Sequence, residues 1–409
     1  MDKATIARFW RDAQDRIRES GLTVAEARKI DGFMNSKASN RGRKVKYDCL
    51  LLKKEIRAIA YKDRRTFKCL SMATGVPQTT LKRAMNKEKI LRRHSSALKP
   101  TLKDENMVSR VLYCLEEVFP VAKEDGTYLF KDMMDQIDVD EKWFHMTRDN
   151  EKYIVVASDD ENNEADCPVR RVRHKSYIGK VQFLCAQARP RWDLHRNAYW
   201  DGKIGIWPIG DYKAAERTST RRAAGTLVWK DETVTRDVYR RLLVEKVVPA
   251  IIEKWPRGEW NDRTRIIRIQ QDGPNTHIKP NGSQWTAELQ RLGVLNKILI
   301  YTQPANSPDL NINDLGFFRA LQASYARFSP KTPDDIIKYV KKAHSEFHWR
   351  KINRIWLSLM MVMNQIIDTN GNNDYTLPHM GKEKLEVRGQ LPTTIAVTST
   401  AITLLEQNS

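Results

Sequence analysis

Residues Gln136–Phe144 read QIDVDEKWF, and this stretch decides how the rest of the chain is interpreted. Side chains of a β-strand point alternately to its two faces, so Asp138 and Asp140 share one face. We therefore predict a strand over Met134–Phe144 that presents Asp140 near its end.

Runs of both periodicities follow this strand. Short apolar runs predict strands, and apolar residues at helical spacing predict helices. Strands are expected over Tyr153–Ala157, Val181–Ala188, Ile204–Ile209, Ile266–Gln271 and Lys297–Tyr301, and helices over Val234–Lys254, Trp285–Leu292 and Asn313–Phe328. After the first strand, three further strands, a helix and then alternating strands and helices are typical of a mixed α/β layer fold. This order fits a ribonuclease H-like domain.

Two more aspartates occupy places that resemble the place of Asp140. Asp272 follows the predicted strand Ile266–Gln271, and Asp314 stands at the start of the predicted helix Asn313–Phe328. In open α/β sheets the carboxyl ends of the strands face the functional crevice. A single aspartate there is more often a cap or a solvated residue, so only the three aspartates together indicate a functional site.

Three carboxylates gathered in one crevice would repel one another unless cations neutralise them. Mg²⁺ and Mn²⁺ favour such oxygen ligands. Two metal ions can activate a water molecule and stabilise the leaving oxygen of a phosphodiester. Asp140, Asp272 and Asp314 are therefore our candidate catalytic and metal-binding residues, for two Mg²⁺ or Mn²⁺ ions.

The positive charge of the chain is concentrated at its beginning. The 409 residues carry a net charge of +20, and residues 1–100 hold 26 Lys+Arg against 10 Asp+Glu. Only +4 is thus left for the other 309 residues. A surplus of this size indicates a polyanionic partner, because a basic surface releases counterions when it meets phosphates. Double-stranded DNA is the partner that we expect, and a membrane surface is the other polyanion to consider.

Residues 50–85 have the pattern of a helix-turn-helix. A helix over Thr66–Ala73, the turn Thr74–Pro77 with its glycine, and a polar helix over Gln78–Met85 follow in that order. The second helix of such a motif enters the major groove. Its exposed face would comprise Gln78, Thr79, Thr80, Lys82 and Arg83. An ordinary pair of antiparallel helices with a charged surface is the alternative.

Basic residues also flank this motif. The polar segment 35–46 contains Arg41, Arg43 and Lys44, and it is either a linker in a minor groove, where arginines fit, or a solvated hinge. Arg92 and Arg93 continue the basic stripe. Both basic runs could also direct the chain to the nucleus.

Other classes of protein fit the sequence poorly. The start of the chain lacks the apolar stretch of a signal peptide. The longest apolar run, near Ile355–Met363, is too short to span a bilayer. The basic helices lack the broad aromatic face of a membrane-surface helix, and the five cysteines form no zinc pattern. We expect an intracellular protein without a membrane or small-molecule partner.

The sequence motifs around the three aspartates resemble those of one family. VDEKWF (139–144), QQDGPNTH (270–277) and the stretch Asn306–Phe318 with SPDLN and DLGFF are similar to the three catalytic blocks of mariner-type transposases, especially the plant-like branch. LRRHSSALKP (91–100), LPHM (377–380) and GQLP (389–392) extend the resemblance. It covers roughly residues 40–395 in order, and the blocks together are highly specific.

The resemblance implies a ribonuclease H-like core with two divalent metal ions on Asp140, Asp272 and Asp314. It also implies inverted repeats as substrate, TA as target and a homodimer as the working unit. Asp309 is a rival for the third acid, but Asp314 enters the helix that presents the third acid in this family. His277 lies near the site in the family, and by sequence alone it is equally a structural residue.

Two segments keep alternative interpretations. The loop over residues 213–230, with its basic stretch Arg217–Gly225, resembles the clamp loop that reaches a partner subunit in this family, or it is a basic surface loop. Asp159–Asp166 is an acidic insert that we interpret as solvated. The whole chain could alternatively be a domesticated DNA-binding protein, a regulator or chromatin factor with a silent core.

The predicted organisation has four parts. Residues 1–100 form the helical DNA-binding region, and residues 101–130 contain a connector helix. Residues 131–340 form the catalytic domain, and residues 341–409 contain C-terminal helices and a tail.

Overall fold

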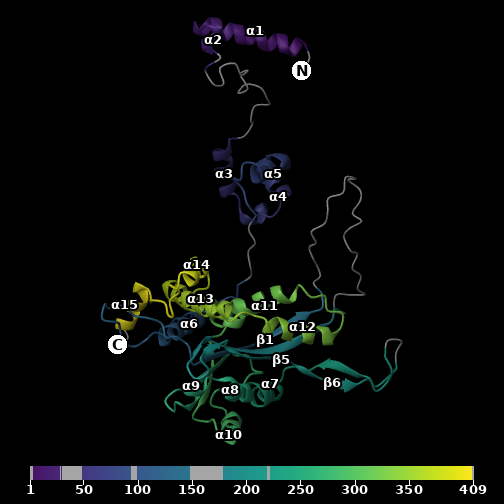
Figure 1. The fold of residues 1–409 in the computed structure, drawn as a ribbon, viewed down its shortest axis with the longest axis vertical. Helices are drawn as coiled ribbons and strands as arrows, with labels where there is room; N and C mark the ends of the chain where they lie inside the picture. Colours follow the sequence, from purple (N-terminus) through teal and green to yellow (C-terminus); the bar gives the residue numbers. More distant parts are fainter. Residues whose placement is uncertain are drawn as a thin grey trace. The chain divides into compact units, whose positions relative to one another are not determined.

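The computed structural model describes residues 3–27, 29, 48–93, 99–147, 178–218 and 222–407. The chain divides into two compact units, Met1–Ala97 and Leu98–Ser409, and each is described by itself (Figure 1). The predicted strand Tyr153–Ala157, the acidic insert, and Arg41, Arg43 and Lys44 lie outside the described residues.

The first unit begins with α1 (Lys3–Ser20) and α2 (Val24–Ala27). Gly21 separates them with a φ of +66°, a left-handed conformation that favours glycine. Thr23 begins α2 with a capping box, because Glu26 accepts from the Thr23 backbone N–H at 2.9 Å while the Glu26 N–H donates to Thr23 Oγ1 at 3.3 Å.

The same unit contains a helix-turn-helix, which confirms the predicted arrangement of helices. Its elements are α3 (Cys49–Ala58), η2 (Tyr61–Arg64), α4 (Phe67–Thr74) and α5 (Gln78–Asn86). Gly75 ends α4 with a φ of 67°. A small core of Leu52, Ile56, Leu70, Val76, Leu81 and Ala84 holds the helices together. The polar face of α5 is thereby left outward.

The second unit is built on a five-stranded sheet in the order β5-β2-β1-β8-β9. Its strands are β1 (Gln136–His145), β2 (Lys180–Ala188), β5 (Lys203–Pro208), β8 (Ile267–Gln271) and β9 (Ile298–Thr302). Strands β1, β2 and β5 pair antiparallel, whereas β8 and β9 pair parallel to β1. Three antiparallel strands followed by two parallel ones confirm the predicted mixed sheet.

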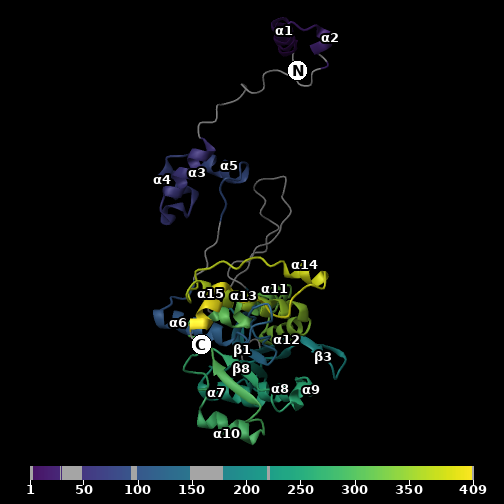
Figure 2. The same cartoon turned by 90° about the vertical axis from the view of Figure 1, so that its left-hand side faces the viewer.

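Helices cover both faces of this sheet (Figure 2). One layer contains α6 (Asp104–Glu116), η5 (Pro308–Leu310), η6 (Asn313–Phe317), α11 (Phe318–Tyr325), α12 (Pro333–Ser345) and α13 (Trp349–Asp368). The opposite layer contains α7 (Arg236–Leu242), η4 (Leu243–Val247), α8 (Val248–Lys254), α9 (Arg257–Asn261) and α10 (Ser283–Arg291). Because side chains alternate along β1, Phe144 packs into the core between the sheet and the first helical layer. Ile137 and Val139 pack into the core between the sheet and the opposite layer.

Two hairpins and a C-terminal segment complete the unit. The hairpins are β3 (Arg191–Asp193) with β4 (Ala198–Trp200), and β6 (Gly210–Ala214) with β7 (Leu227–Asp231). The C-terminal segment contains α14 (Lys382–Val387) and α15 (Ser399–Gln407). Backbone bonds of Phe130 to Ile395 and of Val397 to Tyr128 join this segment to the fold, so the tail is part of the first core layer.

Two helices differ from the sequence-based expectation. The helix expected over Val234–Lys254 contains the π-helical turn η4, and the helix expected over Asn313–Phe328 begins with the π-helical turn η6. Such turns insert a residue into a regular helix and occur often at functional sites. Within the described residues, no helix has both the length and the apolar character needed to cross a membrane.

Candidate active site

The three predicted acids line one cleft in the second unit. Asp140, Asp272 and Asp314 face a cavity of about 420 Å³, and the loop that follows β9 and residue Pro100 form other parts of its wall. The acids come from segments more than 40 residues apart in the chain. The fold therefore brings together the residues that sequence spacing alone could not.

Each acid reaches the cleft by a different local structure. Asp140 lies on β1, Asp272 directly follows β8, and Asp314 lies in η6. The parallel pairing of β1 with β8 runs only from Gln136 to Asp138. This ladder ends before Asp140, and Asp140 and Asp272 both line the cleft beyond its end.

The acids influence one another electrostatically. Burial raises the pKa of Asp140 well above its usual range, and the carboxylates of Asp314, Glu141 and Asp272 add to the effect. Burial also raises the pKa of Asp314, whereas the nearby Lys142 ammonium and a hydrogen bond with Asp140 oppose that rise. The cleft thus concentrates negative charge that a cation would stabilise.

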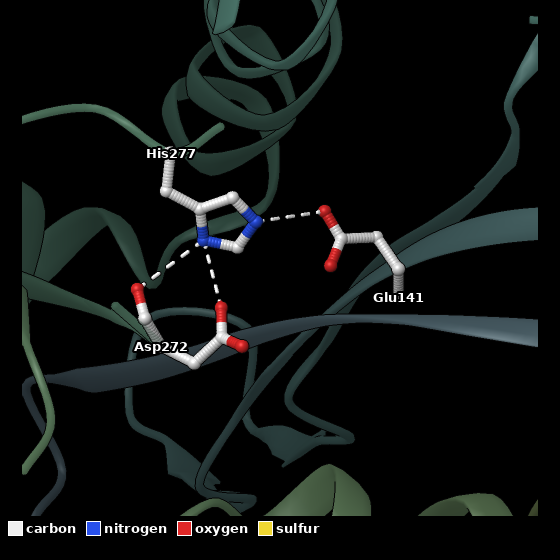
Figure 3. Close-up of side chains that lie close together, drawn as sticks. All are labelled: Glu141, Asp272 and His277. Carbon is white, nitrogen blue, oxygen red and sulfur yellow. Dashed lines mark hydrogen bonds and ion pairs between the residues drawn. The ribbon is translucent and has the colours of Figure 1, made fainter. Parts of the chain in front are cut away.

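His277 joins Asp272 to the strand that carries Asp140 (Figure 3). Its Nδ1 lies 2.8 Å from Asp272 Oδ1 and 3.2 Å from the Asp272 carbonyl oxygen, and its Nε2 lies 3.1 Å from Glu141 Oε1. The ring stacks on Tyr239 at 3.9 Å between centroids and an angle of 7°. The histidine is thereby fixed in orientation by three neighbours.

Glu141, Asp272 and His277 offer ligand atoms within 4.8 Å of one another, a spacing that a metal ion could use. However, the imidazole ring lies between the two carboxylates and directs one nitrogen to each of them (Figure 3). One ion cannot contact both nitrogens of a single ring. We therefore interpret this group as a hydrogen-bonded support of Asp272.

The charge of His277 predicts a specific pH dependence of stability. Burial alone would lower the pKa of His277, but its bonds with Asp272 and Glu141 outweigh burial and raise the pKa to about 10. Since the ordinary value is 6.5, the stabilisation is complete below pH 6.5 and disappears as the pH rises through 10. In metal-free protein, the difference in unfolding free energy between wild type and His277→Gln should shrink over this window.

His344 supplies the matched control with the opposite sign. It is buried beside Phe317, and burial lowers its pKa to about 3. The stabilisation from neutral His344 is therefore present above pH 6.5 and is lost as the pH falls toward 3. A difference for His277→Gln that stays constant from pH 6 to pH 10 would contradict the charged pair.

The structure separates Asp309 from the third acid. Arg110 on α6 is fully buried and donates to both carboxylate oxygens of Asp309 at 2.7 Å, and to the Gly371 carbonyl at 2.8 Å. The Tyr375 hydroxyl also donates to Asp309. Both Asp309 oxygens therefore hold the loop before η6 in place, and Asp309 does not line the cleft.

Breaking this buried pair should destabilise the fold strongly. Arg110→Met leaves the Asp309 carboxylate without its cation, which typically costs about 3–5 kcal/mol. Urea denaturation followed by circular dichroism measures the loss. Arg327→Met removes an exposed pair with Glu346 and should change stability little. Equal effects of the two substitutions would contradict the assigned role of Arg110.

The predicted DNA-contact residues lie where a groove-binding helix would need them. Gln78, Thr79, Lys82 and Arg83 are exposed on α5, and Thr80 is half-buried, whereas Leu81 packs inward. Arg92 and Arg93 are exposed after the motif, with the Arg93 guanidinium 5.5 Å from the Phe67 ring centroid. Their contact with DNA stays a prediction.

Sequence reasoning missed the partner of His277. Glu141 follows Asp140 directly, so strand alternation assigns it to the opposite face, and nothing in the local pattern connects it to a residue 136 positions away. The one available signal was the position of His277 five residues after Asp272.

No protein-family model and no curated protein sequence matches the chain. Solved structures do match its fold. The match to the pre-cleavage Mos1 transpososome has a TM-score of 0.55 at 16% identity, and it covers 85% of this chain and 86% of the matched chain. The Mos1 strand transfer complex has a TM-score of 0.54 at 15% identity, with coverages of 89% and 98%. The Mos1 mariner paired-end complex with Mn has a TM-score of 0.53 at 15% identity, with coverages of 85% and 86%.

These likenesses extend over most of the chain and confirm, at the level of the fold, the resemblance drawn from the sequence. A helical front region precedes a ribonuclease H-like sheet with helices on both faces. The chain has the fold of the mariner transposase chains.

Proposed function

We propose that the chain is a mariner-type transposase that binds terminal inverted repeats, cleaves DNA at the transposon ends and transfers the 3′ hydroxyl into TA target DNA. One observation carries the proposal. Three aspartates from the three blocks that resemble the family line a single cleft, on a fold shared with Mos1.

The chemistry of the cleft fits divalent metal ions. Asp140, Asp272 and Asp314 offer only carboxylate oxygens, the ligands that Mg²⁺ and Mn²⁺ favour. Burial and mutual repulsion raise the pKa of Asp140 and, with burial first, that of Asp314. We propose that the three aspartates hold two Mg²⁺ or Mn²⁺ ions. Such ions, when bound, activate water and stabilise the leaving oxygen of a phosphodiester.

The protein's own groups would position these acids and the DNA. The His277 ring holds Asp272 against β1 through Glu141. Lys142 places a positive charge near Asp314. The outward residues of α5 would contact base edges in the major groove, and Arg92 and Arg93 would contact phosphates. Cleavage would then proceed by direct attack of water, without a covalent protein intermediate.

We also propose that the protein works as a homodimer and acts in the nucleus. The loop between β6 and β7 would reach a partner subunit in a homodimer, and the basic runs would direct the protein to the nucleus. Hairpin β6–β7 pairs from Gly210–Asp231 to Ala214–Leu227, which gives that loop a regular base.

An excision assay tests this function. A plasmid that carries the element with its inverted repeats is incubated with the protein and Mg²⁺, and the released fragment is sequenced at its ends. Cleavage at the repeat boundary that EDTA abolishes is the expected result. Sequence-specific binding without nicking would overturn the enzymatic proposal and favour the domesticated DNA-binding protein.

A further inference from the structure

The segment that presents Asp314 is hydrogen-bonded to Asp138 and Val139 of β1. The Ile312 backbone N–H donates to Asp138 Oδ2 at 2.8 Å, and the Asn313 side-chain amide donates to the Asp138 carbonyl at 2.9 Å. The Asn311 side-chain amide donates to the Val139 carbonyl at 3.2 Å. These bonds connect the residues just before one proposed metal ligand to those just before another.

Asp138 is a costly residue at this position. Its side chain is fully buried, and its second carboxylate oxygen accepts from Gln136 Nε2 at 2.8 Å. A well-packed apolar residue would avoid the cost of burying a carboxyl group. Asp138 does not line the cleft, so contact with a substrate does not account for it.

Asp138 lies at the end of the hydrogen-bond ladder between β1 and β8. The parallel ladder between β1 and β8 ends at the pair Asp138–Gln270. Beyond that pair, this ladder no longer fixes β1 relative to the neighbouring elements of the cleft. The side chains of Asp138, Asn311 and Asn313 supply hydrogen bonds at the point where the ladder stops.

We propose that Asp138 is a positioning residue that sets the place of Asp314 relative to Asp140. The bond from the Asn313 side chain to the Asp138 carbonyl oxygen supports the same connection. The inference rests on the proposed function, because its consequence is the geometry of a two-carboxylate metal site. Asp138 acts through η6 and does not touch the reacting atoms.

Loss of this connection should weaken metal binding before it affects DNA binding. Residues that orient metal ligands typically change metal affinity or activity by about 10–100-fold when they are replaced. Asp138→Ala should lower Mn²⁺ affinity and the cleavage rate by factors in this range. Asp138→Asn should keep most of both, since its amide oxygen can still accept from Ile312.

The experiment compares full-length variants bound to inverted-repeat DNA. Mn²⁺ affinity is measured by electron paramagnetic resonance, cleavage by gel assay, and stability by thermal unfolding. Asn313→Ala removes only the second bond and is the milder test if Asp138→Ala folds poorly. Asn364→Ala is the matched control, because it removes two partly buried hydrogen bonds that join α13 to the tail, one to Ala396 and one from Thr398.

The expected result is weaker Mn²⁺ binding for Asp138→Ala and Asn313→Ala, rescue in Asp138→Asn, and unchanged Mn²⁺ binding for Asn364→Ala at a comparable loss of thermal stability. Equal Mn²⁺ affinity in Asp138→Ala, Asn313→Ala and the control Asn364→Ala would overturn the inference. Failure of the wild-type protein to bind Mn²⁺ or to cleave would instead overturn the proposed function.

Discussion

Asp272→Ala is expected to reduce DNA cleavage by at least about a thousandfold, because several kcal/mol of metal-dependent stabilisation of the transition state are lost. Asp272 lines the cleft together with Asp140 and Asp314. It lies in the second unit, whereas the helix-turn-helix belongs to the first. Specific binding to the inverted repeat should therefore be retained.

Two measurements on the same preparation check this prediction. Gel-shift titration gives the affinity for inverted-repeat DNA, and a strand-cleavage assay with Mg²⁺ gives the rate. Glu288→Ala, which removes an acid from α10 that pairs with Arg291, should leave both unchanged. Cleavage by Asp272→Ala at the wild-type rate would refute the assignment of the metal site.

Removal of residues 1–97 is expected to cost most of the DNA affinity and most of its dependence on salt. Residues 1–97 hold 25 Lys+Arg against 10 Asp+Glu and so carry 15 of the 20 net positive charges. A protein with six to ten phosphate contacts loses about 10³–10⁵ in affinity between 50 and 200 mM salt. The full chain should show a loss of this order, whereas the unit Leu98–Ser409 should bind weakly at both concentrations.

Fluorescence anisotropy with labelled duplex at several salt concentrations measures both slopes. Arg92→Gln in the full chain provides a graded control, because loss of one phosphate contact lowers the salt slope by about one. If a fragment of residues 98–409 had the DNA affinity and the salt slope of the full chain, the second unit would make most of the DNA contacts. That result would contradict the prediction.

Much of the fold could be predicted because local patterns agree with the tertiary structure. Alternation around Asp140 located β1 within two residues, and Gly75 located the turn of the helix-turn-helix. Both features arise from backbone geometry, which neighbouring residues determine. The π-helical turns η4 and η6 were missed, since an inserted residue leaves the apolar spacing of a helix nearly unchanged.

The candidate site was predictable only in part for a physical reason. The three aspartates lie in recognisable sequence motifs, but the residues that hold them in place come from distant segments. Arg110 binds Asp309 across 199 residues, and Asp138 binds Ile312 across 174. No periodicity relates such pairs, because the packing of α6 and η6 on the sheet creates them. The choice of Asp314 over Asp309 gained its structural reasons from the cleft, which Asp314 lines, and from the bond of Arg110 to Asp309.

The most direct test of the account is to locate bound Mn²⁺ in crystals by its anomalous scattering. The proposed metal site should hold two ions, bound by Asp140, Asp272 and Asp314, with His277 still bonded to Asp272. Crystals in which Mn²⁺ binds only between Glu141 and His277, or in which the cleft binds none at millimolar Mn²⁺, would contradict it.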